Sequence, residues 1–495
     1  MQEGATLSGS QLPTQIHGPP RLQKKIRTLL ELYSDCFRSI VSPKPAKIQP
    51  FSFNIDEAKW TGSRVNNTRY RTQSAKKNEE MDRQIKLLLD LKVIRESRRD
   101  RYSQVHLVPK PNNKWRFCLD YRFLNSCTDM EGGVIPMIYE LLQRIGRKRP
   151  KFFAVIDFTS GYHQAPIAED TIPFTAFVTH RGVYEWVRLP MGLKGAPSYF
   201  QREVAKILAG LIGSICELYL DDLIVFGETE EEFMSNLKLV LDRLREYNIT
   251  CNPDKCRFGV ESIEYVGHTI DSEGLTFSEE KLDQVLNFPL PKLIKELHSF
   301  LGLVNYFGGH LRDLSTALAG LRQLLANSQK SKRLEWTDTL KQDFERVKHM
   351  VNTLPKLYFL NNTDPVTVYT DASDYGIGAY VCQNVNNEER PVAFMSKALS
   401  STERNWTTIE KECYVIYMTF RKFEYLLRDI KFTLKTDHAN LLYLNVPPSS
   451  KVLRWKLAIQ EFDCEVEHLA GVKNVVADGF SRLLDSSSNQ PSRAE

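Results

Sequence analysis

Two adjacent aspartates interrupt an apolar stretch near the middle of the chain. In CELYLDDLIVFG (216–227), Asp221 and Asp222 are flanked mainly by leucine, isoleucine, valine and phenylalanine. A buried carboxylate is costly, and two neighbouring carboxylates raise each other's pKa. A divalent cation such as Mg²⁺ removes both penalties, because it prefers oxygen ligands and shares them with substrate phosphates. The pair therefore predicts a metal site for phosphate chemistry; the alternative is an exposed Asp-Asp at a hairpin tip.

A third carboxylate, Asp157, ends the apolar run FFAVI in KFFAVIDFTSGYHQ (151–164). If its strand lies beside the strands that flank Asp221, the two carboxylates can bridge a pair of metal ions. Such a pair activates an attacking hydroxyl, stabilises a leaving pyrophosphate and supports in-line displacement at phosphorus. The three aspartates together favour nucleotidyl transfer.

Four more carboxylates recur in the last quarter of the chain, and most of them follow or interrupt apolar runs. They are Asp371 after VTVYT, Glu412 in TIEKECYVIY, Asp437 after KFTLKT and Asp478 in NVVADGFSR. Four carboxylates from four elements can hold two metals, as in nucleases. Glu410 is a rival for Glu412, because both fall near the same helical turn.

The elements that must position these side chains alternate between strands and helices. Two strand-like runs around a Pro-Asn-Asn turn predict a hairpin over 103–125. Helical spacing of apolar residues predicts helices over 76–101 and 196–212, and one long helix over 405–429. From residue 366 the order of strands and helices predicts a second α/β domain.

The composition limits the class of protein. The chain has 495 residues, too many for one ordinary core, and no apolar run long enough to cross a bilayer. Its net charge of +5 is compatible with a polyanionic partner. The nine cysteines form no CxxC pair, which favours reduced thiols in the cytosol over disulfides or a zinc site.

Six ordered motifs carry a resemblance to the reverse transcriptases of gypsy-class LTR retrotransposons. YLDD (219–222) and IDFTSGYHQ (156–164) resemble the palm motifs that hold the catalytic aspartates. LVPKPNNKWRFCLDYRFLN (107–125) resembles the fingers hairpin, and GVYEWVRLPMGLKGAPSYFQ (182–201) resembles the segment beside the nucleotide. YVGH (265–268) resembles the primer grip, and HSFLGLVNYF (298–307) resembles a thumb segment. TDAS, EKE, TDH and VAD are typical of the attached ribonuclease H.

This resemblance covers roughly residues 30–485 and implies a multi-domain α/β fold. A right-hand polymerase with fingers, palm and thumb is followed by a ribonuclease H-like α/β domain with a five-stranded mixed sheet. The expected divisions are a disordered linker (1–25), fingers and palm (26–275), thumb or connection (276–360), the ribonuclease H domain (361–485) and a disordered tail (486–495).

The resemblance also assigns residues to the incoming nucleotide. Tyr162 lies where the family keeps an aromatic gate against a ribose 2′-OH; the alternative is a tyrosine packed on a helix. Lys110 and Arg116 are placed to hold the triphosphate. The alternative is that both are solvated charges of the hairpin. Gly192 lets the backbone approach base or template, whereas Met191 departs from the Gln or Phe of related enzymes.

The primer grip is assigned to Tyr265, Val266, Gly267 and His268. YFGGHL (306–311) replaces a more basic thumb segment, which implies a weaker grip on the duplex.

In the ribonuclease H domain the four C-terminal carboxylates are expected to activate water against the RNA strand of a hybrid. The resemblance favours Glu412 over Glu410, because the family's glutamate directly precedes an apolar run, here CYVIY. His468 lies where retroviral enzymes place a mobile catalytic histidine, although a structural role is favoured. Asp374 and His438 are expected beside the site or at the surface.

A duplex passing both sites needs a basic channel, for which Arg98, Arg99, Arg101 and RKRPK (147–151) are candidates; a solvated surface charge is the favoured reading of each one.

The sequence therefore predicts an enzyme, an RNA- and DNA-templated DNA polymerase with ribonuclease H activity, for retrotransposon cDNA synthesis. Two Mg²⁺ per site, or Mn²⁺, are the implied cofactors. The implied partners are an RNA template, a DNA primer, an RNA–DNA hybrid and dNTPs, without a membrane, and the chain is a monomer or a homodimer. A cytoplasmic virus-like particle is the implied location, with nuclear entry left open.

Three alternatives differ in what they require. An RNA-templated RNA polymerase conflicts with the aromatic gate and the nuclease domain. A non-catalytic nucleic-acid-binding subunit or domesticated scaffold has no reason to keep seven carboxylates. The intact carboxylates likewise oppose a variant engineered to lack one activity.

Overall fold

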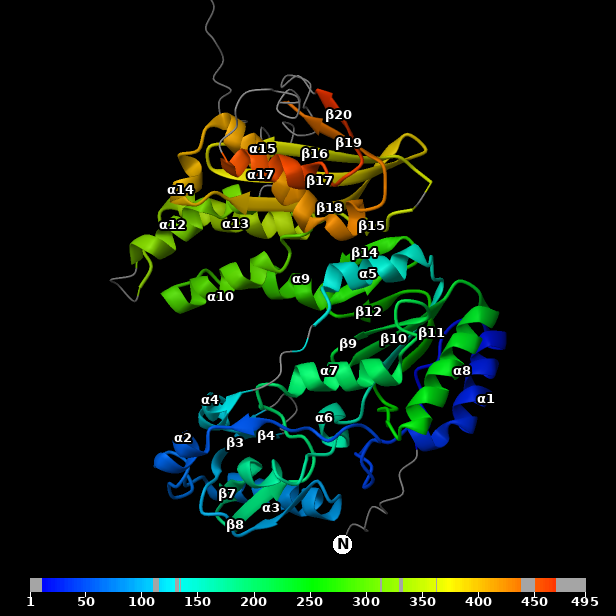
Figure 1. The fold of residues 1–495 in the computed structure, drawn as a ribbon, viewed down its shortest axis with the longest axis vertical. Coiled ribbons are helices and arrows are strands. Elements are labelled where there is room, and N and C mark those ends of the chain that lie inside the picture. The colour runs from blue at the N-terminus through cyan, green and yellow to red at the C-terminus, as the bar shows by residue number, and fades with distance from the viewer. Residues whose placement is uncertain are drawn as a thin grey trace, which may run out of the picture. The chain divides into compact units, whose positions relative to one another are not determined.

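The computed structural model describes residues 11–109, 115–129, 133, 135–311, 314–328, 333–361, 363–437 and 450–468. The chain divides into two compact units, Met1–Val266 and Gly267–Glu495. Figure 1 shows the helices and strands of each unit. No helix in these described ranges is long and apolar enough to cross a membrane.

An antiparallel sheet forms the centre of the first unit. Its strand order is β11-β6-β10-β9, with β6 spanning Phe152–Asp157 and β10 spanning Asp222–Gly227. Both strands consist largely of buried apolar residues, which suits a strand covered on both faces. Helix α8 (Glu230–Glu246) packs against β10 and β6, and α1 (Pro20–Leu32) packs against α8 and β11 (Figure 1).

A second sheet of the first unit has the order β2-β8-β7-β3-β4. The predicted hairpin at 103–125 is present as β3 and β4, which pair antiparallel with Val105 opposite Leu119. The remaining strands and helices of the first unit are β1 (Asn54–Ile55), β2 (Ile94–Ser97), β3 (Ser103–Pro109), β4 (Trp115–Leu119), β5 (Thr128–Asp129), β7 (Phe177–Thr179), β8 (Gly182–Trp186), β9 (Cys216–Tyr219), β11 (Arg257–Val260), β12 (Ile263–Tyr265), α2 (Glu57–Gly62), α3 (Ala75–Asp90), α4 (Arg122–Cys127), α5 (Ile138–Arg147), α6 (Gly161–Gln164) and α7 (Ala196–Ile207), with short 3₁₀ turns at Ser34–Cys36 and Ile172–Thr175.

The second unit begins with a helical region and continues into a mixed sheet. The helical region has its own buried core, centred on Phe300, Val304 and Phe344. Its elements are β13 (His268–Ile270), β14 (Gly274–Phe277), α9 (Glu279–Leu286), α10 (Ile294–Asn305), α11 (Leu314–Ala317), α12 (Ala319–Asn327), α13 (Asp338–Asn352) and β15 (Leu357–Tyr358).

Five strands of the described residues form the mixed sheet, in the order β18-β17-β16-β19-β20. β17 runs antiparallel to both of its neighbours, β16 and β18, whereas β19 runs parallel to β16 and β20 runs parallel to β19. The sheet's strands and helices are β16 (Val366–Ala372), β17 (Gly376–Val385), β18 (Glu388–Ala398), β19 (Phe432–Thr436), β20 (Cys464–His468), α14 (Ser401–Arg404), α15 (Thr408–Lys422), α16 (Glu424–Leu427) and α17 (Ser450–Ile459).

Three predicted segments differ from the structure. The helix predicted over 76–101 is wrong beyond Asp90, because Lys92 adopts a φ of +54° and the following Ile94 begins a strand that pairs with β8. The long helix predicted over 405–429 is two helices separated at Phe423. The linker predicted over 1–25 is wrong for its last six residues, which form the start of α1 and bury Leu22.

All nine cysteines are free thiols, as their spacing predicts.

Candidate active sites

Two neighbouring strands of the central sheet bring the first three carboxylates together. Asp222, the first residue of β10, stands directly opposite Asp157, the last residue of β6. The next pair along the ladder is Leu223 opposite Ile156, so the acidic pair lies at the end of an apolar ladder. Asp221 occupies the tight turn that joins β9 to β10, beside this pair.

The turn that carries Asp221 is conformationally unusual. Leu220 has a φ of +54°, a left-handed conformation that costs a non-glycine residue about 1–3 kcal/mol. The buried side chain of Gln201 on α7 stabilises this turn from both sides. Its Oε1 accepts a hydrogen bond from the Leu220 N–H, and its Nε2 donates to the Leu218 carbonyl at 3.2 Å. Sequence reasoning gave Gln201 no role, because only the folded turn reveals these two bonds.

The carboxylates of this site perturb one another. Burial, together with the nearby charges of Asp222 and Asp157, raises the pKa of Asp221 to about 6. Burial and the charge of Asp157 also raise the pKa of Asp222. Such shifts are the expected result of placing three carboxylates at one poorly hydrated position without a cation.

The chemistry of these side chains fits a divalent metal. Oδ1 of Asp221 is buried and accepts no hydrogen bond from the described residues, so it retains a free lone pair. Lys255, whose role sequence reasoning missed, places its Nζ 3.1 Å from Oδ2 of Asp157 and supplies part of the missing positive charge. In the described ranges no three acidic, histidine or cysteine side chains form a preformed metal group. A cation here therefore needs additional oxygens, which substrate phosphates ordinarily provide.

The predicted gate, Tyr162, lies on the single turn α6 immediately beside this site. Its half-buried ring packs edge-on against Phe200, with ring centroids 5.4 Å apart. Burial and the charge of Asp221 raise the pKa of the Tyr162 hydroxyl to about 12. A Cβ atom on Gly161 would lie 3.3 Å from Oδ1 of Asp221, so α6 and the turn that carries Asp221 are in close contact.

The other predicted nucleotide contacts differ in how the structure places them. Arg116 lies on β4 with an exposed side chain, whereas Lys110 falls outside the described residues. Met191 is exposed, and Gly192 has a φ of +100° that favours glycine. Asn125 holds this segment: its Nδ2 donates to the Gly192 carbonyl at 2.9 Å, a contact that sequence reasoning missed.

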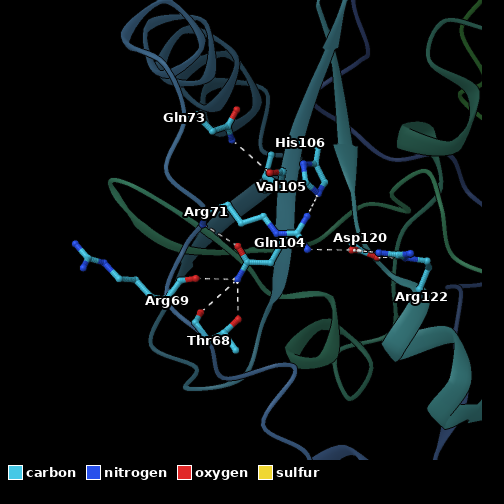
Figure 2. Close-up of polar contacts among 9 residues, drawn as sticks. All are labelled: Thr68, Arg69, Arg71, Gln73, Gln104, Val105, His106, Asp120 and Arg122. Atoms are coloured by element: carbon cyan, nitrogen blue, oxygen red, sulfur yellow. Dashed lines mark hydrogen bonds and ion pairs between the residues drawn. The ribbon is translucent and has the colours of Figure 1, made fainter.

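A polar cluster surrounds the same hairpin (Figure 2). Arg122 makes a two-point ion pair with Asp120 at 2.8 Å for both bonds, and Arg71 approaches Asp120 at 3.8 Å. Arg71 also contacts the ring of His106, and its backbone N–H donates to Gln104 at 3.1 Å. These contacts fasten the segment before α3 to β3, and they add two exposed guanidinium groups to the hairpin that carries Arg116.

The predicted primer-grip residues lie where the two units meet in the sequence. The Tyr265 hydroxyl is buried and donates to the carbonyl of Asp222 at 3.2 Å, which links this hairpin to β10. Val266 and Gly267 have φ values of +50° and +77°, as in a tight turn. His268 is buried among aromatic rings of the second unit.

The candidate channel residues separate into two groups. Arg98 and Arg99 are exposed, as are the charged residues of 147–151. Arg101 instead donates to the Ser63 carbonyl at 2.7 Å and to Oδ1 of Asn66 at 2.8 Å, so its guanidinium is largely used inside the fold.

The second carboxylate cluster lies on the mixed sheet. β16 and β19 are parallel, and the ladder between them ends with Tyr369 beside Lys435. Two residues further along the two strands, the same register places Asp371 beside Asp437. The carboxyl ends of neighbouring parallel strands thus bring these two acids together.

Glu412 approaches the pair from α15, which packs on β16. Its side chain is 1% exposed. Burial, followed by the charges of Asp437 and Asp371, raises the pKa of Glu412 to about 9, although a hydrogen bond from the backbone of Ala372 opposes this shift. Three carboxylates from three elements therefore act on one another, and their oxygens are suitable ligands for a divalent metal.

The rival Glu410 is engaged elsewhere. It forms a capping box with Thr407 at the start of α15 and an ion pair with Lys451 at 3.0 Å. This placement favours Glu412 as the residue that serves the acidic cluster. Asp374 is exposed and pairs with the buried Lys411 at 2.8 Å, which ties the loop after β16 to α15.

Asp478 and His438 lie outside the described residues, so their predicted positions are not described. His468 ends β20 with an exposed side chain, in register with Thr436, the residue before Asp437.

The two regions match two known protein families. Residues 108–270 match the family described as reverse transcriptase (RNA-dependent DNA polymerase). Residues 361–462 match the family described as RNase H-like domain found in reverse transcriptase. The fold and the acidic clusters thus define a reverse transcriptase domain followed by a ribonuclease H-like domain, both from families that use divalent metal ions.

The full-length relatives narrow this class. The chain is 36% identical over 420 residues to the retrovirus-related Pol polyprotein from transposon opus of Drosophila melanogaster, covering 82% of the chain and 42% of that polyprotein. It is 34% identical to the Pol polyprotein from transposon 412 of the same organism, covering 82% of the chain and 33% of that polyprotein. It is 30% identical to the transposon Tf2-3 polyprotein of Schizosaccharomyces pombe, covering 81% of the chain and 30% of that polyprotein. The chain is similar to the retrovirus-related Pol polyproteins of transposons, and it spans less than half the length of these relatives.

Solved structures agree on the fold. The chain resembles foamy viral protease-reverse transcriptase in complex with an RNA/DNA hybrid, with a TM-score of 0.77 and 22% identity, covering 97% of this chain and 63% of that one. The same viral protein in complex with dsDNA gives a TM-score of 0.77 at 21% identity, covering 93% and 98%. The predicted fold class, a right-hand polymerase followed by a ribonuclease H-like domain with a five-stranded mixed sheet, is confirmed.

Proposed function

We propose that this chain copies RNA and DNA templates into DNA and degrades the RNA strand of the resulting hybrid. The observation that carries the proposal is the pairing of Asp157 with Asp222 at the end of an apolar ladder, beside Asp221. A buried acidic group of this kind is otherwise destabilising, and the matching families provide a reason for keeping it.

In the polymerase site, Asp157, Asp221 and Asp222 would hold two Mg²⁺ ions, or Mn²⁺ in their place. When bound, these ions would activate the primer 3′-hydroxyl and neutralise the leaving pyrophosphate. The protein's own contribution is position. The Gln201-stabilised turn orients Asp221, and the paired strands orient the other two carboxylates.

Around these carboxylates the chain would bind and select the dNTP. Arg116, with Lys110, would hold the triphosphate oxygens, and the ring of Tyr162 would exclude a 2′-OH. Met191 and Gly192 would line the base or template, and residues 265–268 would hold the primer end. The exposed Arg98 and Arg99 would contribute to binding the duplex backbone.

In the second site, Asp371, Glu412, Asp437 and Asp478 would hold a second pair of metal ions. Glu412 is protonated at neutral pH in the metal-free protein, since its pKa is about 9, and it would release that proton when a cation enters. The substrate would be the RNA strand of an RNA–DNA hybrid, which is recognised by its 2′-hydroxyls.

Several wider features belong to the same proposal. The functional divisions would be fingers and palm over 26–275, thumb over 276–360 and ribonuclease H over 361–485. The chain would serve cDNA synthesis of a gypsy-class retrotransposon, as a monomer or a homodimer, inside a cytoplasmic virus-like particle.

The test is made on the full chain with Mg²⁺ and dNTPs. A DNA primer annealed to RNA, and the same primer annealed to DNA, are both expected to be extended. A labelled RNA–DNA hybrid is expected to lose its RNA strand, and EDTA should stop all three reactions. Tight hybrid binding with no extension and no cleavage would instead establish a non-catalytic binding subunit.

A further inference from the structure

A buried arginine beside the polymerase site has no acidic partner among the described residues. The side chain of Arg188 is 4% exposed, and its guanidinium faces three backbone carbonyls. Burial lowers its pKa to about 10, so the group remains charged at neutral pH. A buried charge without a carboxylate is costly, which calls for a reason to retain it.

The carbonyls that Arg188 contacts belong mainly to α6. Nη1 donates to the carbonyl oxygens of His163 and Gln164, at 3.4 Å each, and Nη2 donates to that of Pro43 at 2.6 Å. α6 is a single turn of four residues that follows Ser160 at a φ of +47°. A single turn has no stability of its own, so its position depends on such outside contacts.

Other contacts show that α6 is fixed along its length. The ring of His163 stacks on Trp186 with centroids 5.0 Å apart, and its Nδ1 donates to the Leu189 carbonyl at 3.0 Å. The buried Gln164 side chain donates to the Thr250 carbonyl at 2.8 Å. Tyr162 follows Gly161, which lies against Oδ1 of Asp221, and the charge of Asp221 acts on the Tyr162 hydroxyl, whose ring packs on Phe200.

We propose that Arg188 is a positioning residue that sets sugar selectivity, because it holds the carbonyl end of α6 and thereby fixes the ring of Tyr162 beside Asp221. This inference rests on the proposed function, in which Tyr162 excludes the ribose 2′-OH. The planar guanidinium can bridge several carbonyls at once, which the ammonium of a lysine does with poorer geometry.

The experiment measures kcat/KM for a dNTP and for the matching rNTP in the full chain, and the readout is their ratio. Arg188→Met should lower this ratio about tenfold while kcat/KM for the dNTP falls by less, since small displacements of a positioning group have such effects. Arg188→Lys should lower it about threefold. In a Tyr162→Ala background, Arg188→Met should lower the ratio no further, because the gate is already absent.

The matched control is Arg245→Met, which removes from α8 an arginine bound to Asp35 and to the carbonyl of Leu32 at the end of α1. This variant should lower the melting temperature and leave the sugar ratio unchanged. If Arg188→Met does not fold, Arg188→Lys decides the question by the same ratio.

Wild-type ratios in both Arg188 variants would overturn the inference, as would an equal further loss in the Tyr162→Ala background. These outcomes differ from a failure of the proposed function, in which the unmodified chain extends no primer or Tyr162→Ala leaves sugar selectivity unchanged.

Discussion

Asp222 on β10 is the direct cross-strand partner of Asp157 on β6. Like charges at opposite positions destabilise an antiparallel pair, and the half-buried Asp221 in the adjoining turn adds a third charge. Lys255 offsets only part of this charge, through its ion pair with Asp157. A divalent cation bound at this end of the sheet would relieve the repulsion between the carboxylates, and the proposed site therefore has several measurable consequences.

Acid should weaken the polymerase through Asp221. Its pKa of about 6 lies above the ordinary value, so the carboxylate is protonated, and unable to bind a metal, as the pH falls through 6. The Mg²⁺ concentration that gives half-maximal primer extension should rise about tenfold for each pH unit below 6. A requirement for Mg²⁺ that stays constant between pH 5 and 7 would contradict this assignment.

Lys255 should set the pH at which acid begins to slow primer extension, which is the acid limb of the pH–rate profile. Its positive charge lowers the pKa of Asp221 and of Asp222. Lys255→Met should therefore move the acid limb of primer extension to higher pH and reduce the rate at pH 6 about threefold. Lys255→Arg keeps the charge and serves as the control. An acid limb that stays in place for Lys255→Met would show that this ion pair has no influence on the site.

Glu412 and Glu410 should affect stability in opposite directions. The unfolded chain releases the Glu412 proton above about pH 4.5, whereas the metal-free fold keeps it until its raised pKa of about 9, so the stability of the fold decreases as the pH rises between these values. Glu412→Gln should abolish hybrid cleavage and, in EDTA at pH 8, stabilise the chain by about 1–3 kcal/mol. The gain should vanish near pH 4.5.

Glu410→Gln is the matched control on the same helix. It weakens the capping box and the ion pair with Lys451, whose combined contribution is about 0.5–1 kcal/mol. This variant should lower the melting temperature and retain hybrid cleavage. If thermal unfolding in EDTA ranks the two variants in the reverse order, the acidic cluster has been assigned to the wrong glutamate.

Gln201 should matter for the rate of extension more than for binding. Gln201→Ala removes the two hydrogen bonds that support the left-handed Leu220 turn, so Asp221 loses its fixed position. We expect kcat for primer extension to fall about 10- to 100-fold with KM for the dNTP nearly unchanged. Hybrid cleavage by the same preparation provides the control, since loss of both activities would indicate general unfolding.

The sequence predicts the carboxylate clusters because an acidic residue within or at the end of an apolar run is unfavourable unless it has a function. An aspartate that ends or interrupts an apolar run stands out by composition alone, and Asp157, Asp222 and Glu412 all lie where that pattern places them. The same reasoning cannot find Gln201 or Lys255, whose partners are 19 and 98 residues away in the sequence. Only the fold brings such groups together.

The errors in the predicted elements also have physical causes. Helical spacing continued through the charged run after Asp90, but pairing of Ile94 with Trp186 across a sheet overrides local helix propensity. Pro20 reads as part of a linker, although proline is favoured at the first turn of a helix, where α1 begins.

The most direct test of two independent metal-dependent sites is a crossed assay on two single variants. Asp221→Asn and Asp371→Asn are each tested for primer extension on RNA and for cleavage of an RNA–DNA hybrid. We predict that Asp221→Asn loses extension by at least about 100-fold and retains cleavage, and that Asp371→Asn shows the reverse pattern. Retention of near wild-type extension by Asp221→Asn, or of near wild-type cleavage by Asp371→Asn, would contradict the account.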